Sequence, residues 1–221
     1  LIASVYDKCP DTATLDIQLY PYLDANFAAT TNYGCSPFTA ELNNYSIGAS
    51  EHRWYFGDGD SLITSQDSTV YYQYTDSAGN PPTIYEAMLA VENSDGCRDT
   101  MTREITIYSV YAGFTSDTAG CNPLDIDFTN QSSGAIFYEW DFGDDGESSL
   151  KNPEHEFENY SGSDTTYTTR MIATNIIGCK NTATQGITIY PYLESLFTID
   201  TGDGCTPITT TGTNLSTGAN E

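Results

Sequence analysis

The chain has 221 residues, of which 31 are acidic and 7 are basic, so its formal net charge at pH 7 is −24. Affinity for nucleic acid depends on Lys and Arg at the phosphates, and this charge therefore excludes nucleic acid as a partner. Hydrophobic residues make up 38% of the chain and aromatic residues 13%, which is too rich for a disordered protein. No apolar run reaches the ~18 residues of a membrane helix, so we expect no membrane insertion in this segment.

The sequence repeats itself at an interval of roughly 85 residues, which is the signature of a repeat array. Trp54-Tyr-Phe-Gly-Asp-Gly59 returns as Trp140-Asp-Phe-Gly-Asp-Asp-Gly146. The repeats also share a Gly-Cys-x-Pro segment, at Cys35, Cys121 and Cys205, and a later Gly-Cys pair, at Cys97 and Cys179, with Cys9 in the equivalent place. We expect the C-terminal end of a repeat over 1–20, complete repeats over 21–108 and 109–190, and the start of a further repeat over 191–221.

Apolar and polar residues alternate along most of the chain, as in strands that bury one face. The alternation begins with Leu15, Ile17 and Leu19, and it recurs at Ile105 and Ile107. In the first complete repeat it predicts seven strands, at about 24–31, 37–44, 51–56, 61–65, 69–75, 83–92 and 98–108. The expected fold class is therefore all-β, with tandem immunoglobulin-like seven-stranded β-sandwiches stacked end to end as a rod.

The six cysteines indicate disulfides, and hence an exported protein, rather than a zinc site. Seven strands place Cys35 and Cys97 at opposite ends of one sandwich, about 20 Å apart, whereas bridged Cα atoms lie within about 7 Å. End-to-end stacking would instead bring Cys35 beside Cys179 of the next repeat. We therefore expect a Cys35–Cys179 bridge, with Cys97 pairing upstream and Cys121 and Cys205 downstream. The alternative pairs, Cys35–Cys97 and Cys121–Cys179 within single repeats, stay open.

Several segments together resemble the PKD domain, an immunoglobulin-like module. They are the Trp-x-Phe-Gly-Asp segments, the strand end Phe128-Thr-Asn-Gln-Ser132, the segment Asn152-Pro-Glu-His155, and a late strand from Tyr167 to Gly178. With its Gly-Cys pairs, the chain is similar to the PKD arrays of large secreted or cell-surface adhesin and fibre proteins of Bacteroidota. The resemblance implies an adhesin, fibre or stalk role, or an accessory module beside a secreted hydrolase. One departure is Asp145, which is interpreted as an insertion into the second loop.

The repeated motif has a structural interpretation, in which the aromatic residues face the core, glycine allows a positive φ and aspartate caps the turn. The motif residues are Trp54, Phe56, Gly57, Asp58, Gly59, Trp140, Phe142, Gly143, Asp144 and Gly146. The functional alternative is a Ca²⁺ site, because Ca²⁺ takes several carboxylate oxygens. Its candidate ligands are Asp58 with Asp60, or Asp144, Asp145 and Glu147, and a second candidate place lies at Asp24 and Glu194.

No catalytic arrangement stands out. His52 and His155 occupy unlike positions in their repeats, and we expect both to be turn or surface residues rather than bases for a nucleophile. No pair of carboxylates is singled out for glycoside hydrolysis. We therefore expect that the protein is not an enzyme and needs no cofactor beyond the candidate Ca²⁺.

Two classes of function follow. The first is a structural spacer segment of a long extracellular filament or surface adhesin, whose partners are neighbouring repeats and other copies of itself. The alternative is an accessory module that binds polysaccharide or protein for a secreted hydrolase. Such a module would need exposed aromatic side chains in a row, with candidates at Tyr55, Tyr71, Tyr72, Tyr138 and Tyr160. Either function places the protein outside the cell, secreted or at the cell surface.

Overall fold

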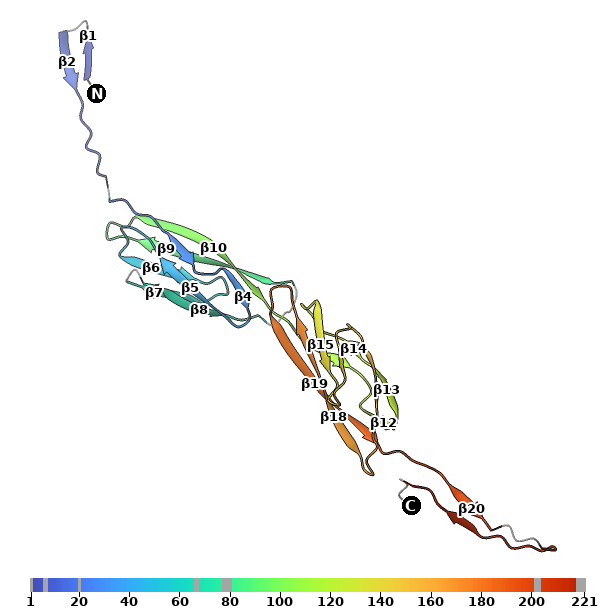
Figure 1. Ribbon diagram of the computed structural model, residues 1–221. Coiled ribbons are helices and arrows are strands. Elements are labelled where there is room, and N and C mark those ends of the chain that lie inside the picture. The colour runs from blue at the N-terminus through green and yellow to red at the C-terminus, as the bar shows by residue number, and fades with distance from the viewer. Residues whose placement is uncertain are drawn as a thin grey trace. The chain divides into compact units, whose positions relative to one another are not determined.

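A computed structural model describes residues 2–5, 8–19, 21–65, 68–76, 81–200 and 204–217, without the side chains of 3–5 and 8–11. Over these ranges the protein consists of β-strands, turns and irregular segments (Figure 1). The expected all-β class is confirmed. The described ranges hold no helix long and apolar enough to cross a membrane.

Contacts group the chain into two compact units, each described by itself. The first comprises Leu1–Tyr33, Phe38–Tyr74 and Ile84–Thr106, and the second comprises Gly34–Pro37, Thr75–Thr83 and Ile107–Glu221. Two short segments of the first predicted repeat, 34–37 and 75–83, thus belong to the second unit. The repeat limits drawn from the sequence stay a prediction.

The strands from 27 to 108 form the two sheets of a first sandwich. One sheet has the order β3 (Phe27–Ala29), β5 (Phe38–Asn44), β8 (Val70–Tyr74). The other has the order β4 (Tyr33–Cys35), β10 (Arg98–Tyr108), β9 (Thr83–Glu92), β6 (Glu51–Tyr55), β7 (Ser61–Thr64). Side chains alternate between the two faces of a strand, so each sheet buries every second residue. The largest fully buried side chains include Phe27, Leu42, Trp54, Tyr74, Leu89 and Ile105.

The first expected strand, 24–31, continues into a second strand that the sequence did not predict. The amide of Thr30 still donates to the carbonyl of Glu41 in the three-stranded sheet (3.0 Å), whereas the carbonyl of Asn32 accepts from Thr106 in the five-stranded sheet (2.8 Å). The chain therefore changes sheets between Thr30 and Asn32, and the sandwich has eight strands instead of seven. The reason is hydrogen bonding: the backbone that leaves one sheet finds partners along the edge of the other.

The second sandwich repeats this plan. Its five-stranded sheet has the order β12 (Ala119–Cys121), β19 (Lys180–Tyr190), β18 (Thr165–Thr174), β15 (Phe137–Asp141), β16 (Glu147–Ser148). β12 runs parallel to β19 and places Cys121 beside Tyr190. The other layer consists of the pairs β11 (Phe114–Thr115) with β14 (Thr129–Asn130) and β13 (Leu124–Asp127) with β17 (Glu154–Phe157). The core includes Phe128, Trp140, Phe142, Phe157, Met171 and Ile187, and Cys179 packs with them.

Short hairpins lie near both ends of the chain: β1 (Ile2–Val5) with β2 (Lys8–Thr12), and β20 (Phe197–Ile199) with β21 (Gly212–Asn214). The strand expected around Leu15, Ile17 and Leu19 is absent, and these side chains are 86%, 78% and 88% exposed. A strand forms only where a neighbour takes its backbone hydrogen bonds, and within the described residues no strand pairs with 13–19. Alternation of apolar and polar residues was therefore not enough to form a strand in this segment.

One small hydrogen-bonded motif lies at the ends of β5, β14 and β21, and we call it the Asn-x-Ser lock. The Oδ1 of Asn44 accepts the amide of Ser46 (3.0 Å), and the Ser46 Oγ accepts the amide of Asn26 (3.1 Å). The lock ties this strand end to the segment that enters the repeat. It recurs at Asn130, Ser132 and Gly113, and again at Asn214, Ser216 and Leu196.

Candidate functional site

The Trp-x-Phe-Gly-Asp segments begin inside the core and leave it at a tight loop. Trp54 and Phe56 are 0% and 2% exposed, and Trp140 and Phe142 are 2% and 1% exposed. Each pair lies two residues apart along an extended segment, so both rings point inward. Their contribution is to core packing.

The glycine that follows is required by its backbone angle and by its neighbours. Gly57 and Gly143 both have a φ of 88°, a region that side chains other than hydrogen disfavour. A Cβ at Gly57 would lie 2.7 Å from the amide nitrogen of Glu86, and one at Gly143 would lie 2.8 Å from the carbonyl oxygen of Thr168. The loop therefore passes directly over the neighbouring strand in both sandwiches.

The aspartate after this glycine caps the loop. The Oδ1 of Asp58 accepts the amide of Asp60 (3.1 Å), and the Oδ1 of Asp144 accepts the amide of Gly146 (3.1 Å). These are turns in which an aspartate side chain takes the place of a backbone acceptor. The aspartates thus have a structural part in both loops.

Asp145 is not an insertion, and that interpretation is corrected. Both loops close over the same length, from the amide of Phe56 to the carbonyl of Asp60 (3.1 Å) and from Phe142 to Gly146 (3.0 Å). Asp145 therefore stands where the first loop has Gly59, and it adopts the same left-handed region, with φ 71° against 104°. Aspartate is among the few residues with a side chain that populate this region.

An aromatic ring with a polar tip covers each loop, and sequence reasoning missed this pair. Tyr72 in β8 stacks on Phe56 with ring centroids 3.7 Å apart, and its hydroxyl lies 2.6 Å from Asp58 Oδ2 and 2.9 Å from Asp60 Oδ2. Burial, followed by these two hydrogen bonds, raises the pKa of the Tyr72 phenol well above its usual value. The phenol therefore remains a hydrogen-bond donor to the loop.

In the second sandwich His155 takes the place of Tyr72. Its ring stacks on Phe142 (4.0 Å between centroids), and its Nε2 lies 2.7 Å from Asp144 Oδ2. The expectation that His155 is a turn or surface residue is wrong, because it lies in β17 and is half-buried. Its partner Asp144 is the same carboxylate that caps the loop. The imidazole therefore packs on Phe142 and holds the loop in place.

His52 is also misplaced by the sequence reading. It lies in β6 and is 1% exposed, because it shares the inward face of the strand with Trp54 two residues later. The same alternation that buried Trp54 could have predicted this burial. A side chain so enclosed cannot serve as an exposed general base.

The carboxylates proposed for the two alternative Ca²⁺ sites lie after β6 (Asp58 and Asp60) and after β15 (Asp144, Asp145 and Glu147). Among the described residues, no cluster of three or more His, Cys, Asp or Glu side chains has a metal-holding arrangement. Asp58 and Asp60 meet at the Tyr72 hydroxyl, and Asp144 is engaged by His155. Asp24 and Glu194 form backbone bridges with Ile47 and Thr217. The Ca²⁺ sites stay a prediction.

The five candidate tyrosines do not form a row. Tyr55 lies in β6 and Tyr71 in β8, which belong to different sheets. Tyr72 stacks in the loop, Tyr138 is half-buried and donates to the carbonyl of Ala135 (3.2 Å), and Tyr160 donates to Glu158 (2.6 Å). This arrangement offers no flat platform for a sugar chain.

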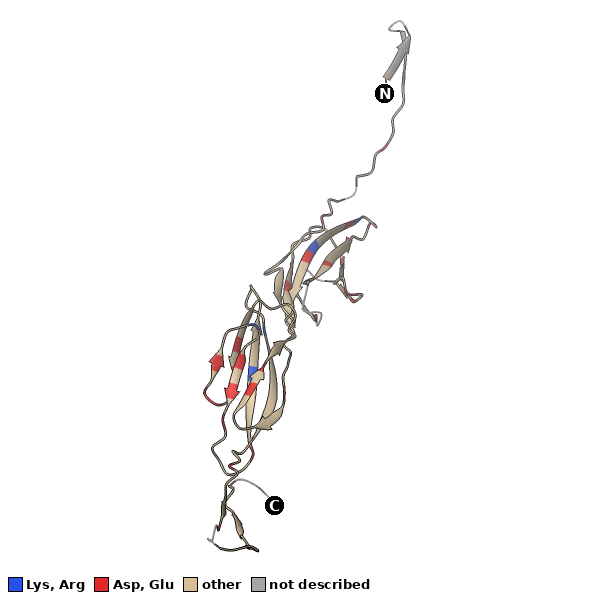
Figure 2. Cartoon of the chain, turned by 90° about the vertical axis from the view of Figure 1, so that its right-hand side faces the viewer, with Lys and Arg blue, Asp and Glu red and all other residues tan. Residues whose placement is uncertain are grey.

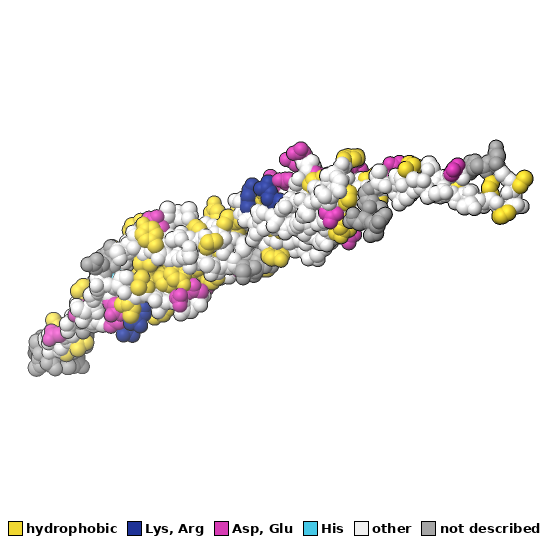
Figure 3. Space-filling model, turned by 90° about the horizontal axis from the view of Figure 1, so that it is seen from below, with side chains coloured by type: hydrophobic (Ala, Val, Ile, Leu, Met, Phe, Trp, Pro, Cys, Tyr) yellow, Lys and Arg dark blue, Asp and Glu magenta, His cyan; other side chains and the backbone are white. Residues whose placement is uncertain are grey.

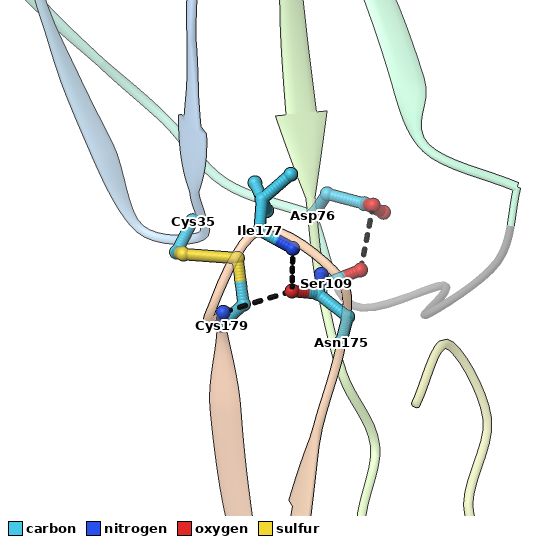
Figure 4. The surroundings of a disulfide bond; sticks show 6 residues. All are labelled: Cys35, Asp76, Ser109, Asn175, Ile177 and Cys179. Atoms are coloured by element: carbon cyan, nitrogen blue, oxygen red, sulfur yellow. Dashed lines mark hydrogen bonds between the residues drawn. A yellow bond between two sulfur atoms is a disulfide. The ribbon is translucent and has the colours of Figure 1, made fainter. Parts of the chain in front are cut away.

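The bridge predicted from strand parity is confirmed. Cys35 and Cys179 form a disulfide with Cα atoms 5.4 Å apart and a sequence separation of 144 (Figure 4). Both cysteines belong to the second compact unit. Cys35 ends β4 and is exposed, whereas Cys179 is 4% exposed and lies at the turn between β18 and β19. The bridge thus joins the first repeat of the sequence to the second.

A buried asparagine shapes the turn that carries Cys179. The Oδ1 of Asn175 accepts the amides of Cys179 (2.8 Å) and Ile177 (3.1 Å), as Figure 4 shows. The backbone of Asn175 also donates to the carbonyl of Cys179 (3.0 Å). These bonds hold the backbone of Cys179 in the turn.

Polar contacts support the bridge from the other side. The Ser36 Oγ accepts the amide of Asp76 (2.7 Å), and the Ser109 Oγ donates to Asp76 Oδ2 (2.8 Å; Figure 4). The Nδ2 of Asn181 donates to the carbonyl of Val110 (2.9 Å). Segments from 34–37, 75–83 and 107–111 thus meet the β18–β19 hairpin within one compact unit.

The alternative pairs within single repeats are not formed. Cys97, Cys121 and Cys205 are free thiols, the first half-buried and the other two exposed. The side chain of Cys9 lies outside the described residues. The pairings expected for Cys97 upstream and for Cys121 and Cys205 downstream stay a prediction.

Basic residues are few, and most of those on the two sandwiches pair with acidic neighbours, whereas Arg103 donates to the carbonyl of Phe27 (3.4 Å). The ion pairs are Arg53–Glu51 (3.2 Å), Arg98–Glu92 (2.9 Å), Arg170–Asp141 (3.1 Å) and Lys180–Glu139 (4.0 Å). In Figure 2 blue positions lie on strands close to red ones, and in Figure 3 basic side chains form small separate groups beside acidic ones. Such exposed pairs contribute little to stability, but they neutralise the positive charges locally.

The fold, with two sheets, a strand that changes sheets and a buried tryptophan, defines an immunoglobulin-like β-sandwich. Residues 110–189 match the family model of the PKD domain. Over these residues the resemblance to the PKD domain drawn from the motifs is confirmed.

Solved structures give more distant similarities. The PKD1 domain of Vibrio anguillarum Epp is 24% identical, with a TM-score of 0.31, and the match covers 38% of this chain and 95% of that one. The PKD1 domain of the Vibrio cholerae metalloprotease PrtV is 23% identical, with a TM-score of 0.30 and coverages of 35% and 93%. Promiscuous carbohydrate-binding modules of the β-sandwich superfamily are 13% identical, with a TM-score of 0.35 and coverages of 75% and 78%. No curated protein matches the chain.

Immunoglobulin-like and PKD domains are typically non-catalytic modules. A PKD domain together with a disulfide is typical of an extracellular or secreted protein. The chain is therefore best described as an extracellular module.

Proposed function

We propose that this chain is a structural spacer segment of a long extracellular filament or surface adhesin built from PKD-like repeats. Its partners are the neighbouring repeats of the same polypeptide and other copies of the chain in a fibre. The segment itself performs no catalysis and supports a function carried elsewhere in the assembly.

The observation that carries this proposal is the Cys35–Cys179 disulfide. It links two successive repeats across 144 residues of sequence, whereas a module that only binds a ligand needs no covalent tie to its neighbour. When the chain is pulled from its two ends, the tension passes through the bridge. Residues 36–178 then carry no load, and the sandwich strands in that range are shielded from unfolding.

A stretching experiment measures this shielding directly. A span of 144 residues extends to about 500 Å when unfolded. When an oxidised chain is stretched from both ends, its maximum extension should be shorter by this length. Adding a reductant under tension should release it. Release of the full length without a reductant would contradict the shielding.

Two further measurements separate the spacer from the accessory module. Small-angle scattering of the full chain should show an elongated particle, and a glycan array probed with the same sample should show no binding. A compact particle, or selective binding of one class of polysaccharide, would favour the accessory module instead.

A further inference from the structure

We propose that the turn around Cys97 is a covalent docking site for the Gly-Cys-x-Pro turn of another PKD-like repeat, and that Cys121 presents such a turn. The inference rests on the proposed spacer function and names the partner chemistry by which repeats or copies are joined. The partner is a second copy of this chain or a further repeat of the same kind.

The acceptor side repeats the geometry of the bridge that is already formed. The Oδ1 of Asn93 accepts the amide of Cys97 (2.9 Å), as the Oδ1 of Asn175 accepts that of Cys179 (2.8 Å). The backbone of Asn93 donates to the carbonyl of Cys97 (3.1 Å), and Asn175 does the same to Cys179 (3.0 Å). The turn at Cys97 is therefore built like one that holds a bridged cysteine.

The donor side shows the same equivalence. Cys35 and Cys121 each end a short strand at the edge of a five-stranded sheet. The residue after each cysteine donates its amide to the last residue of the neighbouring long strand, Ser36 to Tyr108 (2.8 Å) and Asn122 to Tyr190 (3.2 Å). The side chain of Ser36 accepts the amide of Asp76, just after β8, and the side chain of Asn122 accepts the amide of Asn159, just after β17. Cys121 is exposed and carries a free thiol.

A second feature of the Cys97 turn indicates a missing partner. Asn93 is 7% exposed, and its Nδ2 is buried without a hydrogen-bond partner. A buried donor without an acceptor costs about 1–3 kcal/mol, and a carbonyl of an incoming turn would supply the acceptor.

The bond forms by oxidation of two thiols. Cys97 and Cys121 of the partner each lose one proton, and the two electrons reduce a disulfide oxidant, such as glutathione disulfide, to two thiols. The sulfur atoms of Cys97 and Cys121 are then joined.

The test mixes two versions of the full chain in a glutathione redox buffer. The first version carries Cys121→Ser, so that it offers only Cys97. The second carries Cys97→Ser, so that it offers only Cys121. Both versions also carry Cys9→Ser and Cys205→Ser. The Cys35–Cys179 peptide, found by non-reducing mass spectrometry in each copy, shows that both are folded. We expect mixed dimers linked through Cys97 and Cys121 to exceed homodimers at least fivefold. Homodimers in similar amounts, or no cross-link, would overturn the proposal.

A matched pair of substitutions tests the buried amide. In the copy that offers Cys97, Asn93→Asp retains the Oδ1 acceptor but removes the unpartnered donor, and it should lower the yield of mixed dimers severalfold. Asn175→Asp in the same copy should leave the yield unchanged. An equal effect of both substitutions would remove Asn93 from the docking site.

The outcome is separable from that of the spacer proposal. An elongated particle without glycan binding, together with no Cys97 cross-link, would retain the spacer and reject the docking site. Glycan binding together with the mixed dimer would reject the spacer and retain the docking chemistry.

Discussion

The close approach of the Gly143 loop to its neighbouring strand can be isolated by a matched pair of substitutions. Gly143 and Gly178 have similar angles, with φ of 88° and 93°. A Cβ at Gly143 would lie 2.8 Å from the carbonyl oxygen and 2.9 Å from the amide nitrogen of Thr168, whereas one at Gly178 would have nothing within 4 Å. Gly143→Ala and Gly178→Ala therefore share the cost of the backbone angle and differ in the clash.

The magnitudes follow from these contacts. A left-handed angle costs a residue with a side chain about 1–2 kcal/mol, and the stiffer unfolded chain returns about 0.4–1 kcal/mol. Gly178→Ala should therefore lower the free energy of unfolding by about 1 kcal/mol. Gly143→Ala also forces apart two backbone segments, and overpacking adds about 1–3 kcal/mol. Its total loss should be about 2–4 kcal/mol.

Each sandwich contains one tryptophan, so the second can be followed alone. Trp140 is 2% exposed, and in a Trp54→Phe background its fluorescence reports unfolding of the second sandwich in urea. Both variants are measured in this background with the disulfide intact. If the two alanine variants lose the same stability within about 0.5 kcal/mol, the close approach has no energetic weight and the reasoning is refuted.

Three other predictions concern the bridge and the loops. Replacing Cys35 and Cys179 by Ser should lower the free energy of unfolding by up to about 5 kcal/mol in the chain-entropy model for a 144-residue loop, and a loss below about 1 kcal/mol in urea would contradict that model. Asp145→Gly should stabilise the second sandwich by about 0.5 kcal/mol, because glycine adopts the left-handed angle without strain, and destabilisation would assign its carboxylate another role. Because the folded pKa of Tyr72 is raised, its stabilisation is complete below pH 10 and is lost as the pH rises further. The stability of Tyr72→Phe should thus fall less steeply above pH 10, and parallel curves would rule out this linkage.

The sequence predicted the sheets and the bridge because both depend on a period of two. Alternation placed the strands near their observed ranges, and counting strand directions put Cys35 near Cys179 rather than Cys97. The same rule applied to His52 would have shown that it faces the core with Trp54. That error came from judging His52 by its residue type instead of its position.

Other features depend on partners that a single sequence does not reveal. The change of sheets after β3 depends on which strand edge offers hydrogen-bond partners to the backbone. The segment around Ile17 would form a strand only if another strand lay beside it. Tyr72 and His155 share a place over the loop but not a residue type, so only their contacts identify them as equivalent. Their signal in the sequence is an aromatic position two residues before a buried ring.

The Asn-x-Ser lock has the same sequence as the acceptor for N-linked glycans. Sugar is attached to the asparagine Nδ2, and in Asn130 that atom is buried. A cell that glycosylates nascent chains would therefore modify Asn130 before the sandwich closes, and the modified chain could not restore the native contact. Production in a eukaryotic secretory pathway would therefore give two populations, glycosylated molecules that misfold and unmodified molecules that fold. Ser132→Ala would abolish the glycosylation sequence, but it would also remove the serine hydroxyl of the lock.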